Sequence, residues 1–285
     1  MAKTNTNDTQ KGVGLHARRI IAYVVLIIIS FFCLFWFYIM FINATRSNGE
    51  LQSGFTAIPS TNLLKNWNNL VHGTLPIWYG MFNSLIIAAC SAVLCTYFST
   101  MTAYAIHAYD FKMKRFIYPF ILMIMMIPTQ VTALGFIKLI TGMGLMDSFI
   151  PLIVPAWFGG GAFYIFLLRQ FYLGIPKDFE EAARIDGANQ FQIYWKIFMP
   201  IMKPSLILVG VLNMLTVWND YLGPLIFLQD RSKYTLALGL ASFKGVHSTQ
   251  IIPMLCITII MIIPPIIIFI IAQKYIVEGT SGSIK

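Results

Sequence analysis

A polar segment at 218–221 interrupts an otherwise apolar stretch and is the main candidate for binding chemistry. Its members are Trp218, Asn219, Asp220 and Tyr221. The segment sets aromatic faces beside amide and carboxylate acceptors, as sugar-binding sites do, and an acid at membrane depth is by default a functional hypothesis. The alternative is that Gly223 and Pro224 end a helix here and that Asp220 lies at the wet interface.

Four other polar side chains are weaker candidates for lining a substrate pathway. They are Asn83, Thr129, Gln130 and Asn213. An amide or hydroxyl inside an apolar run can face a polar channel, but it can equally hydrogen-bond to a neighbouring helix. For each residue taken alone, the sequence favours the interhelical bond.

No pattern for hydrolytic, nucleotide or metal chemistry occurs in the sequence. The GxxxxGK[ST] loop that cradles phosphates is missing, and the histidines form neither HExxH nor a group with Ser and Asp. The cysteines contain no CxxC pair, so neither a metal site nor a disulfide framework is expected. The residues concerned are His16, His72, His107, His247, Cys33, Cys90, Cys95 and Cys256. We therefore predict that the chain is not an enzyme and binds no cofactor.

The amino-acid composition indicates what kind of element must position these residues. Of 285 residues, 58% are hydrophobic and only 11% are charged, and 23 are Phe. A soluble domain has roughly 25% charged residues. Together with a mean hydropathy of +0.72, these values exclude a soluble fold and a disordered chain and predict a membrane protein.

Six apolar runs are each long enough to cross a hydrocarbon core of about 30 Å. They cover residues 20–42, 83–108, 116–137, 149–168, 204–228 and 251–272. The sequence thus predicts an all-α integral membrane protein with six transmembrane helices. The fifth run is expected to be broken near its polar segment, and Pro264-Pro265 should kink the sixth. Three glycines at 159–161 could form a bend in the fourth, although close helix packing is the simpler explanation.

The distribution of cations predicts the orientation. If the N-terminus is cytoplasmic, only six of the 20 Lys and Arg residues lie outside: Arg46, Lys65, Lys138, Arg231, Lys233 and Lys244. The positive-inside rule therefore places both termini in the cytoplasm. We predict cytoplasmic tails at 1–19 and 275–285 around a transmembrane domain at 20–274. The net charge of +9 then reflects membrane topology and not nucleic-acid binding.

The cytoplasmic loop at 175–203 is predicted to form two helices joined by a glycine. Pro176 can occupy a first turn, acidic residues follow at the positive end of the helix dipole, and Gly187 should end the helix. A second helix is expected from Asn189 to Met199, where Pro200 would stop it. On physical grounds alone, the loop could equally be an amphipathic linker on the inner leaflet.

This loop resembles the EAA loop of binding-protein-dependent ABC transporter permeases. The matching residues are Glu181, Ala182, Ala183, Gly187, Ile197, Met199 and Pro200. The family usually has Leu where Met199 stands, a volume-conserving difference. The longer string EEAARIDGA at 180–188 and the tail QKYIVEG at 273–279 resemble the carbohydrate-uptake branch, specifically the maltose-permease-like subunit.

The resemblance implies a fold, partners and a location. In that family, the loop docks as a coupling helix on a cytoplasmic ATPase, so Glu181, Ala182, Ala183, Gly187, Ile197 and Pro200 would form or shape the contact. The implied complex has a second permease subunit, two ATPase domains that use ATP and Mg, and an extracytoplasmic solute-binding protein, in a bacterial or archaeal plasma membrane.

Two alternatives stay open from the sequence. The cargo could be a polyol or glycerol phosphate instead of an oligosaccharide, because the loop motif indicates an ATPase partner and carries no information on the transported substrate. An ion-coupled secondary carrier would instead need ionisable residues in several spans, and no acid occurs in the first four apolar runs or the sixth.

Overall fold

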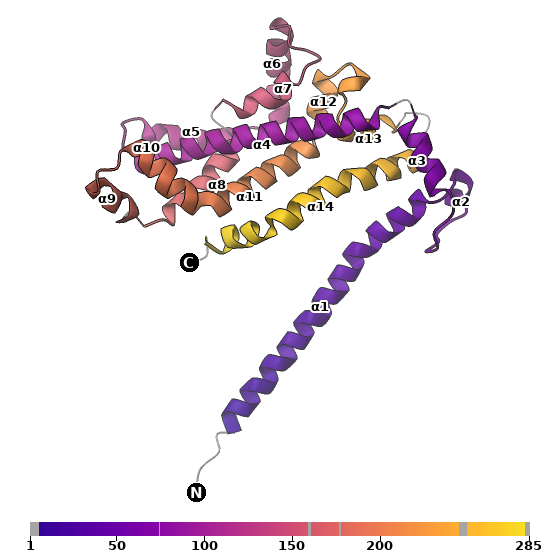
Figure 1. The fold of residues 1–285 in the computed structure, drawn as a ribbon, viewed down its shortest axis with the longest axis horizontal. Helices are drawn as coiled ribbons and strands as arrows, with labels where there is room; N and C mark the ends of the chain where they lie inside the picture. The colour runs from indigo at the N-terminus through magenta and orange to yellow at the C-terminus, as the bar shows by residue number, and fades with distance from the viewer. Residues whose placement is uncertain (1–5, 74, 159–160, 177, 245–249, 283–285) are drawn as a thin grey trace. The chain divides into compact units, whose positions relative to one another are not determined.

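The computed structural model describes residues 6–73, 75–158, 161–176, 178–244 and 250–282. Within these ranges the regular elements are helices (Figure 1), which confirms the predicted all-α class. The α-helices are α1 Thr6–Ala44, α2 Asn48–Gln52, α3 Leu63–Val71, α4 Ile77–Ala108, α5 Lys114–Met125, α6 Thr129–Gly142, α7 Ile150–Ile153, α8 Ala162–Leu173, α9 Asp178–Ile185, α10 Gln190–Ile193, α11 Met199–Trp218, α12 Leu222–Phe227, α13 Leu236–Ser242 and α14 Ile251–Gly282. Short 3-10 turns occur at Val154–Ala156 and Arg231–Lys233, and a π-helical turn at Tyr194–Phe198. His247 and two glycines of the predicted bend, Gly159 and Gly160, lie outside the described residues.

Several helices are long and apolar enough to cross a membrane. In the described part of the chain they are Arg18–Ala44, Ile77–Ala108, Gln190–Trp218 and Ile251–Val277. A bent pair, α5 with α6, passes the same test together, and α8 is a shorter apolar helix. The chain is therefore a multi-pass membrane protein. Helix also extends into both predicted tails, because α1 begins at Thr6 and α14 continues to Gly282.

The third predicted span, 116–137, is wrong as a single straight helix. The chain leaves α5 after Met125 and enters α6 at Thr129, and the two helices are bent by 98°. Pro128 precedes the first residue of α6. Proline disfavours helical geometry in the residue before it, so Ile127 cannot continue α5 into α6.

The fourth predicted span, 149–168, is also not one continuous helix. It is divided into the four-residue α7, a 3-10 turn and the twelve-residue α8. Pro151 and Pro155 lie in the first two pieces, where each removes a backbone donor. Gly161 precedes α8, and its N–H donates to Ser99 Oγ at 3.1 Å.

The fifth span begins earlier than the sequence predicts. A second coupling helix that stops at Pro200 is wrong, because helix runs without a break from Gln190 to Trp218. The π-helical turn lies directly before this proline, and Met199 N–H donates to Tyr194 O. A π turn is wider than an α turn, which lets the chain pass Pro200 despite its missing donor. The predicted break beyond this helix is confirmed, since α11 ends at Trp218.

The chain divides into two compact units. The first contains residues 1–69 and 251–259, and the second contains residues 70–250 and 260–285. In the second unit, α4 packs along α8 and α11, and these three helices lie side by side in Figure 1. Many of the residues that α4 buries are small, including Ser84, Ala88, Ser91, Ala92, Ser99 and Ala103. Small residues allow close approach of helices in a membrane, where dispersion contacts replace the hydrophobic effect.

Candidate functional site

The first helix of the 175–203 loop ends as the sequence predicts. Gly187 has φ of 80°, a left-handed conformation that glycine adopts without a Cβ penalty. Gly187 N–H donates to Arg184 O at 3.1 Å, and Ala188 N–H donates to Ala183 O at 3.0 Å. This pair of bonds is the Schellman motif, which satisfies carbonyls at a helix C-terminus. The turn therefore fixes the direction in which the chain leaves α9.

The second helix of the loop has its own cap. Asn189 Oδ1 accepts from Gln192 N–H at 2.9 Å, and Gln192 Oε1 accepts from Asn189 N–H at 3.0 Å. This reciprocal capping box satisfies donors that the first helical turn would otherwise leave open. The loop thus contains two capped helices and a glycine turn, and is not a flexible linker.

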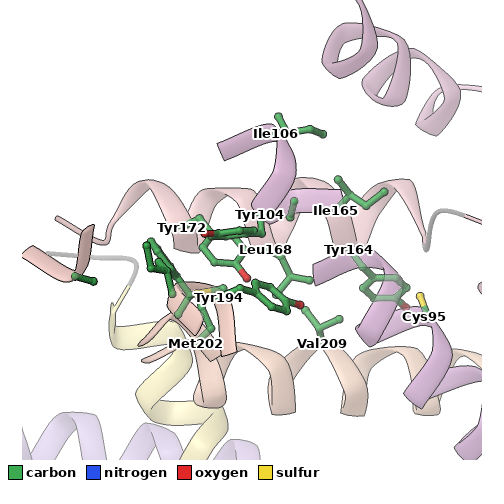
Figure 2. Packing of buried hydrophobic residues seen from close by; sticks show 14 residues of the cluster. Cys95, Tyr104, Ile106, Tyr164, Ile165, Leu168, Tyr172, Tyr194, Met202 and Val209 are labelled. Carbon is green, nitrogen blue, oxygen red and sulfur yellow. The ribbon is translucent and has the colours of Figure 1, made fainter. Parts of the chain in front are cut away.

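An aromatic cluster lies beneath the loop (Figure 2). It joins Tyr104 of α4 and Tyr172 of α8 to Tyr194 and Phe198 of the π-helical turn, with ring centroids 4.9–5.8 Å apart. Tyr172 is fully buried, and Phe198 is 1% exposed. Such aromatic pairs contribute about 0.5–1.5 kcal/mol each beyond the area they bury. The cluster ties the loop to the two helices that form the core of the second unit.

The exposed surface of the loop is largely apolar in the part of it that the structure describes. Phe179, Ile185 and Phe191 are 50%, 86% and 70% exposed. A hollow of about 540 Å³ runs along α9 and is lined by Pro176, Asp178, Phe179, Ala182, Ala183, Asp186 and Ile197. Of the residues carried over from the family motif, Ala183 is buried, Ile197 is half-buried, and Glu181, Ala182, Gly187 and Pro200 are exposed.

The acidic residues of α9 differ in their partners. Glu180 Oε1 lies 2.7 Å from the Arg184 guanidinium, one turn further along the helix, and this hydrogen bond raises the pKa of Arg184. Glu181 makes no hydrogen bond or ion pair with any described residue. An exposed carboxylate without a partner is free to contact another chain, whereas Glu180 stabilises the helix itself.

Most of the polar side chains at 218–221 form hydrogen bonds with backbone groups of this chain. Asp220 Oδ1 accepts from Leu222 N–H at 3.0 Å and Gly223 N–H at 3.2 Å, so this carboxylate caps α12. Asn219 Nδ2 donates to Leu215 O at 2.8 Å. Trp218 is buried, and its Nε1–H donates to Met261 O. Only Tyr221, which is 50% exposed, presents its side chain freely, so the geometry favours the helix-end alternative for Asp220.

The weaker pathway candidates fall into two groups. Asn83 and Asn213 are buried and make bonds between elements: Asn83 Nδ2 donates to Ser232 O at 2.8 Å, and Asn213 Oδ1 accepts from Ser91 Oγ at 3.4 Å. Gln130 and Thr129 are exposed at the start of α6, beside the bend after α5. The structure does not bring Gln130 together with Asn219, Asp220 or Tyr221 in any contact among the described residues.

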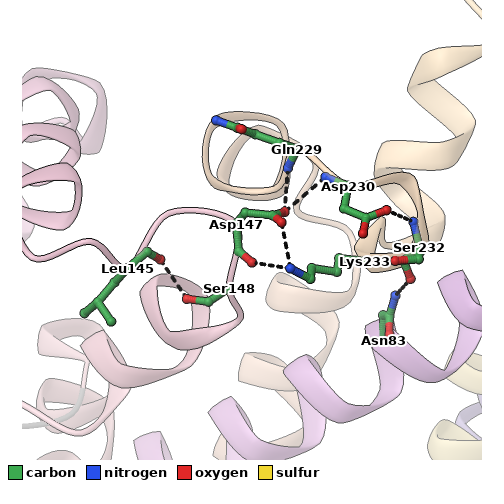
Figure 3. A network of polar contacts seen from close by, with 8 residues as sticks. All are labelled: Asn83, Leu145, Asp147, Ser148, Gln229, Asp230, Ser232 and Lys233. Carbon is green, nitrogen blue, oxygen red and sulfur yellow. Dashed lines mark hydrogen bonds and ion pairs between the residues drawn. The ribbon is translucent and has the colours of Figure 1, made fainter.

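A polar network that the sequence did not single out joins two loops (Figure 3). Asp147 Oδ1 accepts from the N–H groups of Gln229 and Asp230 at 2.9 and 3.0 Å, and Asp147 Oδ2 lies 2.6 Å from Lys233 Nζ. These bonds lower the pKa of Asp147 to about 2. The only sequence signal was an acid in one short loop and a lysine in another, 86 residues apart, which is too weak to pair them.

Comparisons with known proteins give one consistent result. Residues 96–281 match the family described as "Binding-protein-dependent transport system inner membrane component". The arabinooligosaccharides transport system permease protein AraQ of Bacillus subtilis is 32% identical, over 94% of this chain and 96% of the relative. The sn-glycerol-3-phosphate transport system permease protein UgpE of Yersinia pestis is 29% identical, over 93% and 97%.

A solved structure has the same fold. It is a chain of a bacterial ABC transporter involved in the import of the acidic polysaccharide alginate, with a TM-score of 0.76 and 24% sequence identity. The match covers 97% of this chain and 100% of that chain. A second structure, the MetNI methionine ABC transporter, matches with a TM-score of 0.57 over 75% of this chain.

Proposed function

Because the chain belongs to the family of binding-protein-dependent transport system inner membrane components, we propose that it forms half of the translocation pathway of an ATP-driven importer for a carbohydrate. As a member of this family, it is a permease of the ABC importer type. An ion-coupled secondary carrier is no longer a competing hypothesis, since such carriers do not belong to this family.

The cargo is an oligosaccharide in this proposal. The support is the similarity to AraQ, whose name gives arabinooligosaccharides as its cargo, over nearly the full length of both chains. UgpE, a relative named for sn-glycerol-3-phosphate, is 29% identical, so glycerol phosphate is the second candidate. The exposed members of the proposed pathway set are Gln130, Asn219 and Tyr221. Asn83 is buried and Asp220 is half-buried, and both hydrogen-bond to backbone groups.

The 175–203 loop couples the chain to a cytoplasmic ATPase. The observation that carries this step is the exposed apolar surface of two capped helices resting on the buried aromatic cluster. Such a surface can bury its apolar residues on a partner and, being fixed to α4 and α8, can transmit a displacement to them. The partner ATPase binds ATP and Mg, and this chain binds no cofactor.

Six spans with both termini in the cytoplasm complete the proposal. The spans would be α1, α4, the bent pair α5–α6, α8 with the short helical pieces before it, α11 from residue 204 onward and α14. The transmembrane domain at 20–274 then carries the coupling loop inside. The second permease subunit, the two ATPase domains and the solute-binding protein complete the importer.

A reconstitution experiment tests the proposed function. The chain is purified with the subunits encoded beside it and placed in vesicles with their solute-binding protein. ATP-dependent uptake of a labelled arabinooligosaccharide is expected, without uptake of labelled glycerol 3-phosphate. Uptake of glycerol 3-phosphate alone would select the second cargo, and uptake by this chain without an ATPase would refute the importer assignment.

A further inference from the structure

The chain that follows α1 folds back along this helix. We call residues 54–60 the finger. In the first unit, three hydrogen bonds hold the finger against α1 and the residues that follow it. Arg46 Nη1 donates to Gly54 O at 2.9 Å, Tyr38 Oη donates to Ala57 O at 2.7 Å, and Ser60 N–H donates to Thr45 Oγ1 at 2.8 Å. The finger thus starts beside the end of α1, descends to the level of Tyr38 and returns.

The depth of the finger follows from helix geometry. Tyr38 lies six residues before Ala44, the last residue of α1, which is about 9 Å along the axis at 1.5 Å per residue. The tip of the finger therefore lies alongside the apolar helix and not beyond its end. Figure 1 shows the segment after α2 descending beside the end of α1.

Tyr38 also marks the membrane boundary. The apolar run starts at Ile20, and about 20 helical residues span the hydrocarbon core, so the core ends within about one turn of Tyr38. Trp36 and Tyr38 are 70% and 47% exposed, as expected for aromatic residues at a lipid headgroup level. A segment bonded to Tyr38 Oη lies at the same level.

The finger has the composition of a lipid-contacting segment. No charged residue occurs from Leu51 to Leu64. Phe55 and Ile58 lie on either side of the Ala57 bond and are 74% and 75% exposed. The neighbouring part of α1 is exposed and apolar as well, since Leu34 is 67% exposed.

The finger is held rigidly from above. Arg46 is only 4% exposed, and its guanidinium donates to Asn43 Oδ1 and to the carbonyls of Glu50 and Gly54. Glu50 accepts from Ser47 N–H and from Ser60 Oγ, and the Ser47 bond is the main reason why the pKa of Glu50 is lowered. The buried Arg46 therefore fixes the start of the finger at Gly54, while Glu50 and Thr45 hold its other end at Ser60.

We propose that the finger is a membrane anchor, which inserts Phe55 and Ile58 into the lipid interface at the C-terminal end of α1. The leaflet is the outer one in the orientation proposed above. The occupant of this apolar surface is lipid. The Tyr38 bond holds the finger at bilayer depth, and the finger has no charged residue that a soluble partner could recognise. The anchor fixes the rotation and depth of the first span independently of transport.

Fluorescence quenching in nanodiscs tests the anchor. In the full-length chain with its native cysteines replaced, a nitrobenzoxadiazole fluorophore is attached to Phe55→Cys or Ile58→Cys. Asn48→Cys, at the exposed start of α2 in the same unit, is the matched control. Phospholipids brominated on the acyl chains are expected to quench positions 55 and 58 about twofold more than position 48, and aqueous iodide should show the opposite order.

Two results would overturn the proposal. Iodide quenching at 55 and 58 as strong as at 48 would place the finger in water, where a soluble protein could bind it. Protection from both quenchers would mean that another protein chain covers it. Tyr38→Phe removes the hydrogen bond and leaves the helix intact, so lipid quenching at position 55 should fall. Unchanged quenching would refute the Tyr38 bond as the cause of the depth. None of these readouts depends on uptake, so the importer assignment is tested separately.

Discussion

The ring of Tyr104 lies 4.9 Å from the ring of Tyr194, measured between centroids. Tyr104 is one turn from the end of α4, and Tyr194 is the first residue of the π-helical turn. The contact joins the 175–203 loop to a helix that extends to the Asp147 network, since Asn83 near the other end of α4 bonds to Ser232 O. A force on the loop is therefore applied directly to a long, stiff element.

Removing the Tyr194 ring should uncouple the loop. Tyr194→Ala leaves a cavity in the aromatic cluster, and large-to-small changes of buried aromatic residues cost about 3 kcal/mol or more. We expect a lower apparent melting temperature of the purified chain and loss of ATPase copurification. Tyr194→Phe is the control: the Tyr194 hydroxyl has no hydrogen-bond partner among the described residues, so this variant should behave as the wild type. Equal loss in both variants would contradict a packing role.

Gly187→Leu should weaken coupling through backbone conformation alone. The left-handed φ of 80° costs a residue with a Cβ about 1 kcal/mol, while a Cβ at this position meets no atom within 4 Å. The measurement is ATPase copurification together with substrate uptake. Gly187→Asn is the matched control because asparagine tolerates left-handed backbone, and it should retain most of the activity. If Leu and Asn behave alike, strain at this turn is not the cause.

Glu181→Ala should weaken ATPase docking without changing the stability of the chain. Glu181 makes no hydrogen bond or ion pair with any described residue, so its carboxylate is available for an intermolecular contact. Glu180→Ala breaks the 2.7 Å ion pair with Arg184, which is worth about 0.3–0.5 kcal/mol for such a pair on a helix. Copurification should therefore decrease more for Glu181→Ala than for Glu180→Ala. The reverse order would show that α9 stability, and not a contact of Glu181, governs docking.

The Asp147 network should lose its stabilising effect only in strong acid. Bonds to Lys233 and to two backbone N–H groups lower the pKa of Asp147 from 3.8 to about 2. A depressed pKa means that the stabilisation is fully present above about pH 5 and is lost as the pH falls through the folded value. The difference in melting temperature between wild type and Asp147→Asn should be constant from pH 8 to about 5 and should shrink below it.

The substitution is suited to this test because Asp147 has φ of 55°, which asparagine also adopts. A difference that instead grows on acidification would contradict the assignment of the proton to Asp147.

The orientation of the chain makes a direct labelling prediction. A single cysteine at Gln190, in a version without native thiols, should be inaccessible to a membrane-impermeant maleimide in sealed cells. A cysteine at Asp230, in the exposed loop after α12, should be labelled. Labelling at Gln190 from outside would invert the topology and place the coupling loop away from the ATPase.

The sequence could predict the class of fold and the break after Trp218, but not the breaks in the third and fourth spans. Apolar length depends on composition, and it correctly indicated a multi-pass membrane protein. Whether a proline ends a helix depends on the geometry around it. Pro128 lies at the break between α5 and α6, whereas Pro200 lies inside continuous helix because a π turn precedes it. That turn has no signal in the sequence pattern.

The candidate site divides in the same way. The role of Gly187 was predictable because the left-handed backbone that ends a helix favours glycine over other residue types. Asp220 was not, since its carboxylate could face a pathway or cap α12, and only three-dimensional geometry shows the cap. The pairing of Asp147 with Lys233 needs two loops brought together by the packing of α4 and its neighbours, which no local pattern encodes.

The π-helical turn also determines which residues of the loop face outward. In an uninterrupted α-helix, Phe191 would lie two turns before Phe198 and on the same side of the helix, facing the core. The wider turn adds one residue, which rotates the register of everything before it by about 100°. Phe191 is accordingly 70% exposed, while Ile193 is fully buried. Straightening 194–198 into α-helix at the same chain length would therefore turn Phe191 toward the core, whereas deleting one residue from 194–198 would remove the extra residue and leave Phe191 exposed.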